Sequence, residues 1–233
     1  TMAGCSSESE DVKTITVGIS PDYAPYESEN KKGDIVGFDP DMMKCFEEYL
    51  SEEEGVTYKL EMKKMDFDNI ITQLQGDQID VGISGFTYDS KRKVEWSDPY
   101  LGSSQVAVVP KDSDIASTAD LEGKSLVAQT GATGEAAAKE VKDAKVKRFK
   151  NASSAVMELK NGGADAVLID NIMAEIYCKQ NSDLQYESVP STAEDTVFCI
   201  EKGNTELVQI INDGLAKVKK SGEYDDLYQK YFV

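Results

Sequence analysis

The 233-residue sequence contains no histidine. This absence excludes histidine-based acid–base catalysis, Ser-His and Cys-His nucleophiles, and most zinc sites. Basic residues are also scarce, because 25 Lys and Arg stand against 43 Asp and Glu and give a formal net charge of −18. Nucleic acids and anionic membrane surfaces bind proteins through clusters of Lys and Arg. Neither is therefore expected to bind the folded chain directly.

Cysteine and long apolar runs are scarce as well. The four cysteines (Cys5, Cys45, Cys178 and Cys199) show no CxxC spacing, which argues against a zinc knuckle or a redox motif. No spacing rule supports a Cys178–Cys199 disulfide, and none is expected. No apolar run approaches the roughly 18 to 20 residues that span a bilayer. The length suffices for one large domain or two smaller lobes.

The first residues have the composition of a processed leader. Met2-Ala3-Gly4-Cys5, followed by a Ser- and Glu-rich segment, is similar to the lipobox of bacterial lipoproteins, in which Cys5 would carry the lipid. Residues 1–12 are predicted to be a disordered tether. We therefore expect an extracytoplasmic protein that is anchored to the cell membrane through Cys5.

From Thr14 onward, strand patterns alternate with helix patterns, which predicts an α/β fold. Strands are predicted over residues 15–19, 56–60, 81–84, 126–129, 166–169 and 197–200. One helix is expected to start with Asp39 as N-cap and Pro40 as its first residue and to end near Gly55. Further helices are predicted over residues 69–75 and from Asn204 or Thr205 to 220, with Gly222 as the stop.

Two passages of the sequence resemble each other. In residues 74–84 and 159–169, a leucine at a helix end precedes a glycine turn, an aspartate and a buried strand. The leucine and the aspartate are six residues apart in both (80 − 74 and 165 − 159). These passages are interpreted as equivalent helix-to-strand units, one in each of two similar lobes. Ligands of open α/β sheets bind beyond the carboxyl ends of strands, which directs attention to Gly85 and Asp170.

Two further stretches carry groups that suit an anion. Ser84-Gly85-Phe86-Thr87 follows a strand and leads to Lys91-Arg92-Lys93, which offers backbone N–H groups, a hydroxyl and a guanidinium fork. A strand, a polar turn and a solvated basic patch are the alternative interpretation. The turn from Thr130 to Gly134 opens an Ala-rich helix and offers free N–H groups. It matches neither GxGxxG nor a Walker loop, so nucleotide binding is not expected.

Together these residues resemble the polar amino-acid family of extracellular solute-binding proteins, the capture subunits of ABC importers. The resemblance covers about 14–233, and its pieces occur in the family's order and spacing. These pieces are VGISPDYAPY (17–26), VGFD (36–39), MDFDNII (65–71), SGFT (84–87), WSDPY (96–100), QTGATG (129–134) and AVLID (166–170).

The resemblance implies the type II periplasmic-binding-protein fold, with two Rossmann-like lobes, two hinge strands and an amino acid in the cleft between them. The first lobe would comprise residues 13–104 and 197–233, and the second residues 105–196. The lobes would close about strands near Gln105 and Val197. A free amino acid and a membrane permease are the implied partners of a monomer, with no cofactor, no metal and no catalysis.

The resemblance also assigns roles to residues in this cleft. Tyr23 and Phe67 would enclose the ligand's side chain, and Gln129 and Ser20 would face its end. The α-carboxylate would be held by the Gly85 backbone, Thr87, Arg92 and Thr133, and the α-ammonium by Asp170. Ser84 and Thr130 belong to the same two turns and complete the predicted site. Core or surface aromatics are the alternative for Tyr23 and Phe67, and an N-cap is the alternative for Thr133.

One departure from the family affects the position of the arginine. The segment from Arg92 to Trp96 is shorter than in the family, by two residues. Counting forward from Thr87 leads to Arg92, whereas counting back from Trp96 leads to Ser90. Arg92 is preferred because only it supplies a guanidinium, and Lys91 and Lys93 remain alternatives.

The identity of the amino acid stays open. Ser20 and Gln129 are neutral, which favours a polar uncharged ligand, although Asp22 and Glu27 lie near enough in sequence to weaken this argument. A dehydratase acting on an arogenate- or prephenate-like substrate is the alternative function on the same fold. A receptor's sensing domain is a third, and it would need a transmembrane segment.

Overall fold

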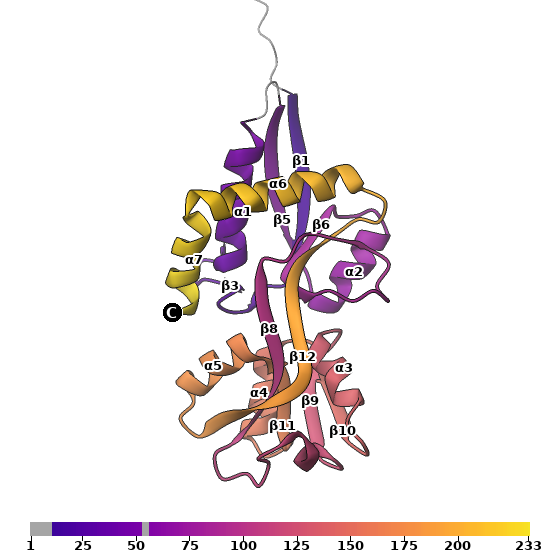
Figure 1. Cartoon of the computed structure of the whole chain (residues 1–233), viewed down its shortest axis with the longest axis vertical. Coiled ribbons are helices and arrows are strands. Elements are labelled where there is room, and N and C mark those ends of the chain that lie inside the picture. The colour runs from indigo at the N-terminus through magenta and orange to yellow at the C-terminus, as the bar shows by residue number, and fades with distance from the viewer. Residues whose placement is uncertain (1–10, 53–55) are drawn as a thin grey trace, which may run out of the picture.

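The computed structural model describes residues 11–52 and 56–233, with residues 190–193 described by their backbone alone. The chain forms two α/β lobes, which lie one above the other in Figure 1 and are joined by two long strands. Cys5 and residues 1–10 of the predicted tether lie outside the described residues. The last two residues of that tether, Asp11 and Val12, belong to the first strand.

The helices and strands follow the predicted alternation. The helices are α1 (Phe38–Leu50), α2 (Phe67–Gln75), η1 (Thr118–Leu121), α3 (Thr133–Lys139), α4 (Ala152–Lys160), α5 (Asn171–Gln180), α6 (Thr205–Ser221) and α7 (Glu223–Phe232). The strands of the main sheet are β1 (Asp11–Ile19), β5 (Val56–Lys64), β6 (Val81–Thr87), β7 (Glu95–Trp96), β8 (Leu101–Pro110), β9 (Ser125–Gln129), β10 (Lys145–Phe149), β11 (Ala166–Asp170) and β12 (Leu184–Ile200). A small second sheet contains β2 (Asp22–Tyr23), β3 (Glu27–Glu29) and β4 (Ile35–Val36).

One curled sheet runs through both lobes in the order β10-β9-β11-β8-β12-β6-β1-β5, with β7 paired to β12. The strands of the first lobe, β5, β1 and β6, are parallel to one another, and so are β10, β9 and β11 of the second. The long strands β8 and β12 pair antiparallel with each other and pass from one lobe to the other. Each lobe therefore has a parallel sheet, and the antiparallel pair joins the two.

The two helix-to-strand units predicted from the sequence are equivalent in detail. The Asp80 carboxylate, which precedes β6, accepts a hydrogen bond from the backbone N–H of Thr16 at 2.8 Å. The Asp165 carboxylate, which precedes β11, accepts one from the backbone N–H of Ser125 at 2.8 Å. Because each aspartate fixes its own strand beside the first strand of its lobe, the carboxyl ends of β6 and β11 are positioned in the same way.

Both predicted ends of the first helix were wrong. Helix α1 begins at Phe38 with Gly37 as its N-cap, so Asp39 is not the cap, and the helix ends at Leu50 rather than near Gly55. Gly37 has φ 140°, and a Cβ there would lie 2.4 Å from the carbonyl oxygen of Tyr26, so only glycine fits this turn. Asp39 instead lies in the first turn and is completely buried.

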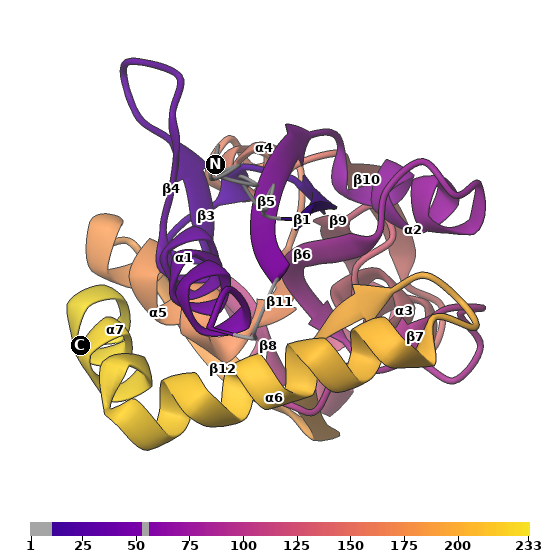
Figure 2. The same cartoon turned by 90° about the horizontal axis from the view of Figure 1, so that it is seen from above.

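The first lobe is closed by the end of the described chain. Helices α6 and α7 follow each other at one side of this lobe, and α7 lies beside α1 (Figure 2). The ring of Phe232 packs against the rings of Tyr26 and Phe38, with centroid distances of 5.2 and 4.8 Å. The core around α1 therefore combines residues from both ends of the described chain.

Candidate functional site

A cavity lies between the two lobes, at the carboxyl ends of β6, β9 and β11, where α/β sheets bind ligands. Its volume is about 30 Å³, enough for a water molecule or two. The residues that line it are Tyr23, Phe67, Ser84, Gly85, Thr87, Arg92, Ser103, Gln105, Gln129, Ala132, Thr133, Gly134, Ala152, Ala155, Val167, Leu168, Ile169, Asp170, Glu194 and Thr196.

Most of the residues predicted for the site meet in this cavity. They are Tyr23, Phe67, Ser84, Gly85, Thr87, Arg92, Gln129, Thr133 and Asp170. Ser20 and Thr130 do not line it. Ser20 is buried one layer behind, where its backbone N–H donates to the Ser84 hydroxyl at 2.8 Å and its own hydroxyl donates to Asp22 at 2.6 Å. Thr130 follows β9 and donates its backbone N–H to the Phe149 carbonyl.

Asp170 supplies a buried carboxylate at the end of β11. One oxygen caps helix α5 by accepting the backbone N–H of Met173 at 2.9 Å, and the other accepts the hydroxyl of Tyr23 from the opposite lobe. Burial raises the pKa of Asp170 to about 6, and the nearby Glu194 carboxylate raises it too, while the Tyr23 hydrogen bond lowers it. Burial also raises the pKa of Tyr23 well above its usual value.

Arg92 supplies the guanidinium of the site. Its Nη2 donates to the Gly131 carbonyl oxygen at 2.5 Å, and its Cζ lies 5.6 Å from the centre of the Phe86 ring. The Nη1 atom is buried and has no hydrogen-bond partner among the described residues. Lys91 and Lys93 are exposed and do not line the cavity. The guanidinium therefore faces the cavity with donor capacity to spare.

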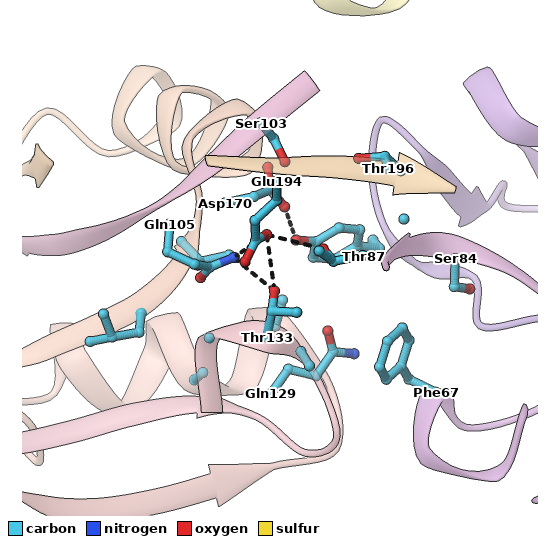
Figure 3. A pocket seen from close by; sticks show the side chains of 18 of the residues that line it. Phe67, Ser84, Thr87, Ser103, Gln105, Gln129, Thr133, Asp170, Glu194 and Thr196 are labelled. Atoms are coloured by element: carbon cyan, nitrogen blue, oxygen red, sulfur yellow. Dashed lines mark hydrogen bonds between the residues drawn. The ribbon is translucent and has the colours of Figure 1, made fainter. Parts of the chain in front are cut away.

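A third charged group, Glu194, lies at the centre of the cavity (Figure 3). Its Oε2 accepts hydrogen bonds from the Thr87 hydroxyl at 3.0 Å, the Thr133 hydroxyl at 3.1 Å and the Gln105 amide at 3.2 Å. Gln105 also donates to the Thr133 hydroxyl at 3.0 Å. The donors come from β6, β8 and the start of α3, so one carboxylate oxygen connects both lobes.

Two aromatic rings, those of Tyr23 and Phe67, form part of the wall. Tyr23 stacks on Tyr26 with a centroid distance of 5.4 Å, and Phe67 stacks on Phe86 at 4.6 Å. Each ring is held from behind by another ring, which fixes its orientation toward the cavity. A Cβ at Gly85, whose φ is 62°, would lie 3.2 Å from the Tyr23 ring, so glycine suits this position.

Behind Gly85, two carboxyl groups are completely buried, namely Glu27 in β3 and Asp39 in α1. Burial raises the pKa of Asp39 to about 6 and raises that of Glu27 well above its usual value, with the charge of Asp39 adding to the second effect. Hydrogen bonds from the Tyr100 hydroxyl and the Gly85 backbone N–H act against the effect of burial on Asp39 and lower its pKa. Glu27 and Asp39 also share a hydrogen bond, which requires a proton on one of the two carboxyls.

Among the described residues, no group of three or more Cys, Asp or Glu side chains could hold a metal ion. The thiols of Cys45, Cys178 and Cys199 are free. No helix in the described ranges is both long and apolar enough to cross a membrane.

The sequence interpretation missed Glu194, Gln105, Ser103 and Thr196 as cavity residues. Gln105 was expected only as a hinge position, and the last strand was expected to begin at Val197. Strand β12 in fact starts at Leu184, so Glu194 and Thr196 are strand residues that share one face. The polar residues before Val197 carry little local signal of this longer strand.

Comparisons with known proteins agree with this architecture. The sequence pattern of the bacterial extracellular solute-binding proteins, family 3, matches residues 15–233. The arginine-binding extracellular protein ArtP of Bacillus subtilis (strain 168) is 36% identical over 229 residues, which cover 95% of this chain and 87% of ArtP.

Solved structures are similar over nearly the whole chain. An ancestral arginine-binding protein bound to arginine has a TM-score of 0.84 and 40% identity, covering 94% of this chain and 98% of that one. An ancestral amino acid-binding protein described as a precursor of cyclohexadienyl dehydratase has a TM-score of 0.83 and 36% identity, covering 94% and 95%.

Proposed function

Because the chain belongs to the bacterial extracellular solute-binding proteins, family 3, and has the type II periplasmic-binding-protein fold, we propose that it captures a polar amino acid and delivers it to the permease of an ABC importer. One observation carries the proposal. Arg92 and Asp170, 78 residues apart (170 − 92), line the same cavity from opposite lobes. A zwitterion that loses water in a closed cleft needs one fixed opposite charge at each end.

The cavity residues divide into two ends and a wall. Arg92, with the Thr87 and Thr133 hydroxyls and the Gly85 backbone, suits the α-carboxylate, because a guanidinium and a carboxylate form two parallel hydrogen bonds. Asp170 suits the α-ammonium. The rings of Tyr23 and Phe67 enclose the ligand's side chain, whose end reaches toward Gln129 and Ser84.

The arginine-binding relatives favour a cationic amino acid, which revises the preference for an uncharged ligand. The cavity lining supplies the buried Asp170 carboxylate beside the Arg92 guanidinium. Asp22, joined to Ser20 one layer behind, adds a further acidic group near the site. L-arginine is accordingly the first ligand to test.

Capture works by hinge closure between the proposed lobes 13–104 with 197–233 and 105–196. Contacts between described residues across the cleft include Arg92 with the Gly131 carbonyl, Tyr23 with Asp170, Thr87 with Glu194, and Lys150 with Asp66 at 3.2 Å. A cavity of about 30 Å³ is too small for an amino acid. Entry therefore requires the lobes to separate about β8 and β12, and a ligand favours closure by contacting both lobes at once.

A screen of the twenty amino acids with cystine and ornithine by thermal shift tests the proposal. A ligand at 100 times its dissociation constant adds about 2.7 kcal/mol to the free energy of unfolding. Small-angle scattering of the protein with this ligand should then give a radius of gyration no larger than that of the ligand-free protein, because only the ligand-free protein samples open forms. Failure of every amino acid to raise the melting temperature would refute the function.

The dehydratase alternative rests on the similarity to the dehydratase precursor. Asp170, with a pKa raised to about 6, is the group that could donate a proton there. The expected result is that incubation with arogenate or prephenate gives no product. A product that disappears in Asp170→Asn would favour the enzyme.

Anchoring and assembly complete the proposal. A lipid on Cys5 holds the protein, as a monomer, at the outer face of the cell membrane beside its permease. Mass spectrometry of the protein extracted from membranes should find a diacylglycerol on Cys5. Recovery of Cys5→Ala from the medium rather than from the membrane is the expected control result.

A further inference from the structure

The carboxylate at the centre of the cavity belongs to the protein itself. Glu194 Oε2 accepts hydrogen bonds from Thr87, Gln105 and Thr133, two of which are the hydroxyls assigned to the ligand's carboxylate (Figure 3). A threonine hydroxyl has only one proton to donate. The two hydroxyls therefore cannot serve Glu194 and a ligand carboxylate together, and two carboxylates at hydrogen-bond distance from the same donors repel each other.

The surroundings of Glu194 give its side chain a second position. Two open surface grooves adjoin it, one lined by Tyr88, Glu140 and Asp195 and the other by Gly102 and Asn171, and Glu194 lines both. The residue is half-buried. Rotation about its side-chain bonds can therefore move the carboxylate from the cavity into water without moving β12.

The positive charge of the site is not used by Glu194. Among the described residues, Arg92 takes part in none of the ion pairs, and its buried Nη1 has no hydrogen-bond partner. Glu194 thus occupies the hydroxyl and amide donors of the anion position and leaves the guanidinium for a stronger, incoming carboxylate. Glu194 therefore takes the place of a ligand carboxylate through neutral donors only, and it forms no permanent ion pair with the guanidinium.

We propose that the Glu194 carboxylate is an internal competitor for the ligand's carboxylate, which holds the cleft closed without ligand and swings into a surface groove when an amino acid binds. The displacement of Glu194 by an amino acid rests on the proposed function. The closure of the cleft by Glu194 without ligand does not, because it is a property of the protein alone. The apparent affinity for a ligand is reduced by the fraction of molecules in which Glu194 occupies the site.

The ligand-free test uses Glu194→Gln and Glu194→Ala, with Asp195→Asn and Asp195→Ala as matched controls. Asp195 is the next carboxylate on β12 and is exposed, and it lines the same grooves, but the donors Thr87, Gln105 and Thr133 bond to Glu194 and not to Asp195. In small-angle scattering, both Glu194 variants should have a larger radius of gyration than the wild type, while the Asp195 variants should not. Sodium acetate, compared with sodium chloride at equal ionic strength, should reduce the radius of Glu194→Ala by supplying a free carboxylate.

The ligand-bound test uses L-arginine and isothermal calorimetry. Glu194→Gln should bind L-arginine about tenfold or more tightly than the wild type, and Asp195→Asn should bind it equally. Weaker binding by both Glu194 variants would overturn competition and make Glu194 a ligand contact. If L-arginine binds no variant, the ligand assignment fails while scattering still decides the closure. Unchanged radii for both Glu194 variants overturn the proposal.

Discussion

Replacing Arg92 by alanine tests the central assignment of the site. The substitution removes the guanidinium that donates to the Gly131 carbonyl at 2.5 Å and whose buried Nη1 has donor capacity left for a ligand. Lys91 and Lys93, its exposed neighbours, carry the same charge and provide matched alanine controls. The three variants therefore change the net charge equally and differ only in the position from which the charge is lost.

The magnitude follows from the geometry. Truncating one partner of a buried, hydrogen-bonded charge pair costs about 2 to 5 kcal/mol. Arg92 is half-buried, so we expect the lower part of this range. A loss of about 2 to 3.5 kcal/mol corresponds to a roughly 30- to 400-fold weaker dissociation constant. The dissociation constant of Arg92→Lys should lie between those of the wild type and Arg92→Ala, because lysine keeps the charge but lacks the planar guanidinium that binds a carboxylate through two hydrogen bonds.

Isothermal calorimetry with the best amino acid from the screen measures these constants, and thermal unfolding without ligand checks the fold. Ligand-free stability should fall by only about 1 kcal/mol, the contribution of the hydrogen bond to Gly131. Severe loss of binding in Lys91→Ala or Lys93→Ala together with mild loss in Arg92→Ala would refute the reasoning. The register across the shortened segment would then be wrong.

Three further predictions concern pH, packing and metals. Between pH 8 and pH 5, amino-acid affinity should fall about tenfold by calorimetry, because the pKa of Asp170 is about 6 and its protonated form cannot pair with an ammonium. The ligand-free protein should instead gain stability as pH falls through 6 toward 4, because Asp170 with its raised pKa binds a proton in the folded state that it releases in the unfolded chain. The variant Asp170→Asn should weaken both effects. Gly134→Ala should lower the free energy of unfolding in urea by about 1 to 3 kcal/mol, because its Cβ would lie 2.2 Å from the Leu168 carbonyl oxygen. The control Gly102→Ala, whose Cβ would have no atom within 4 Å, should change this free energy by less than about 0.5 kcal/mol. Chelation with EDTA should leave binding unchanged, and a loss restored by one divalent cation would contradict this.

The α/β alternation was predictable from the sequence because short apolar runs and helical periodicity are local signals. Helix α6, with Asn204 as N-cap and Gly222 at φ 86°, was correctly placed from its caps. Helix α1 was not, because the turn before it depends on the close approach of Gly37 to the Tyr26 carbonyl. Asp39 precedes a proline, as an N-cap residue would, yet in the structure it lies inside the first turn and is buried beside Glu27.

The site could be predicted only as far as the resemblance reached. Residues at the carboxyl ends of the predicted strands, such as Gly85 and Asp170, do line the cavity. Glu194 could not be found in this way, because its position depends on the pairing of β12 with β8, where it lies opposite Ser103. Long-range antiparallel register leaves little local signal in a polar segment.

The packing of α7 against α1 has a consequence for the order in which the protein folds during synthesis. Phe38 leaves the ribosome 194 residues before its partner Phe232 (232 − 38). At about 5 to 20 residues per second, this interval lasts roughly 10 to 40 s. The elements from β9 to β11 find their partners within a short stretch of chain and can assemble meanwhile. The half of the protein made first is therefore expected to fold last, with its aromatic core exposed to chaperones until the C-terminal helices arrive.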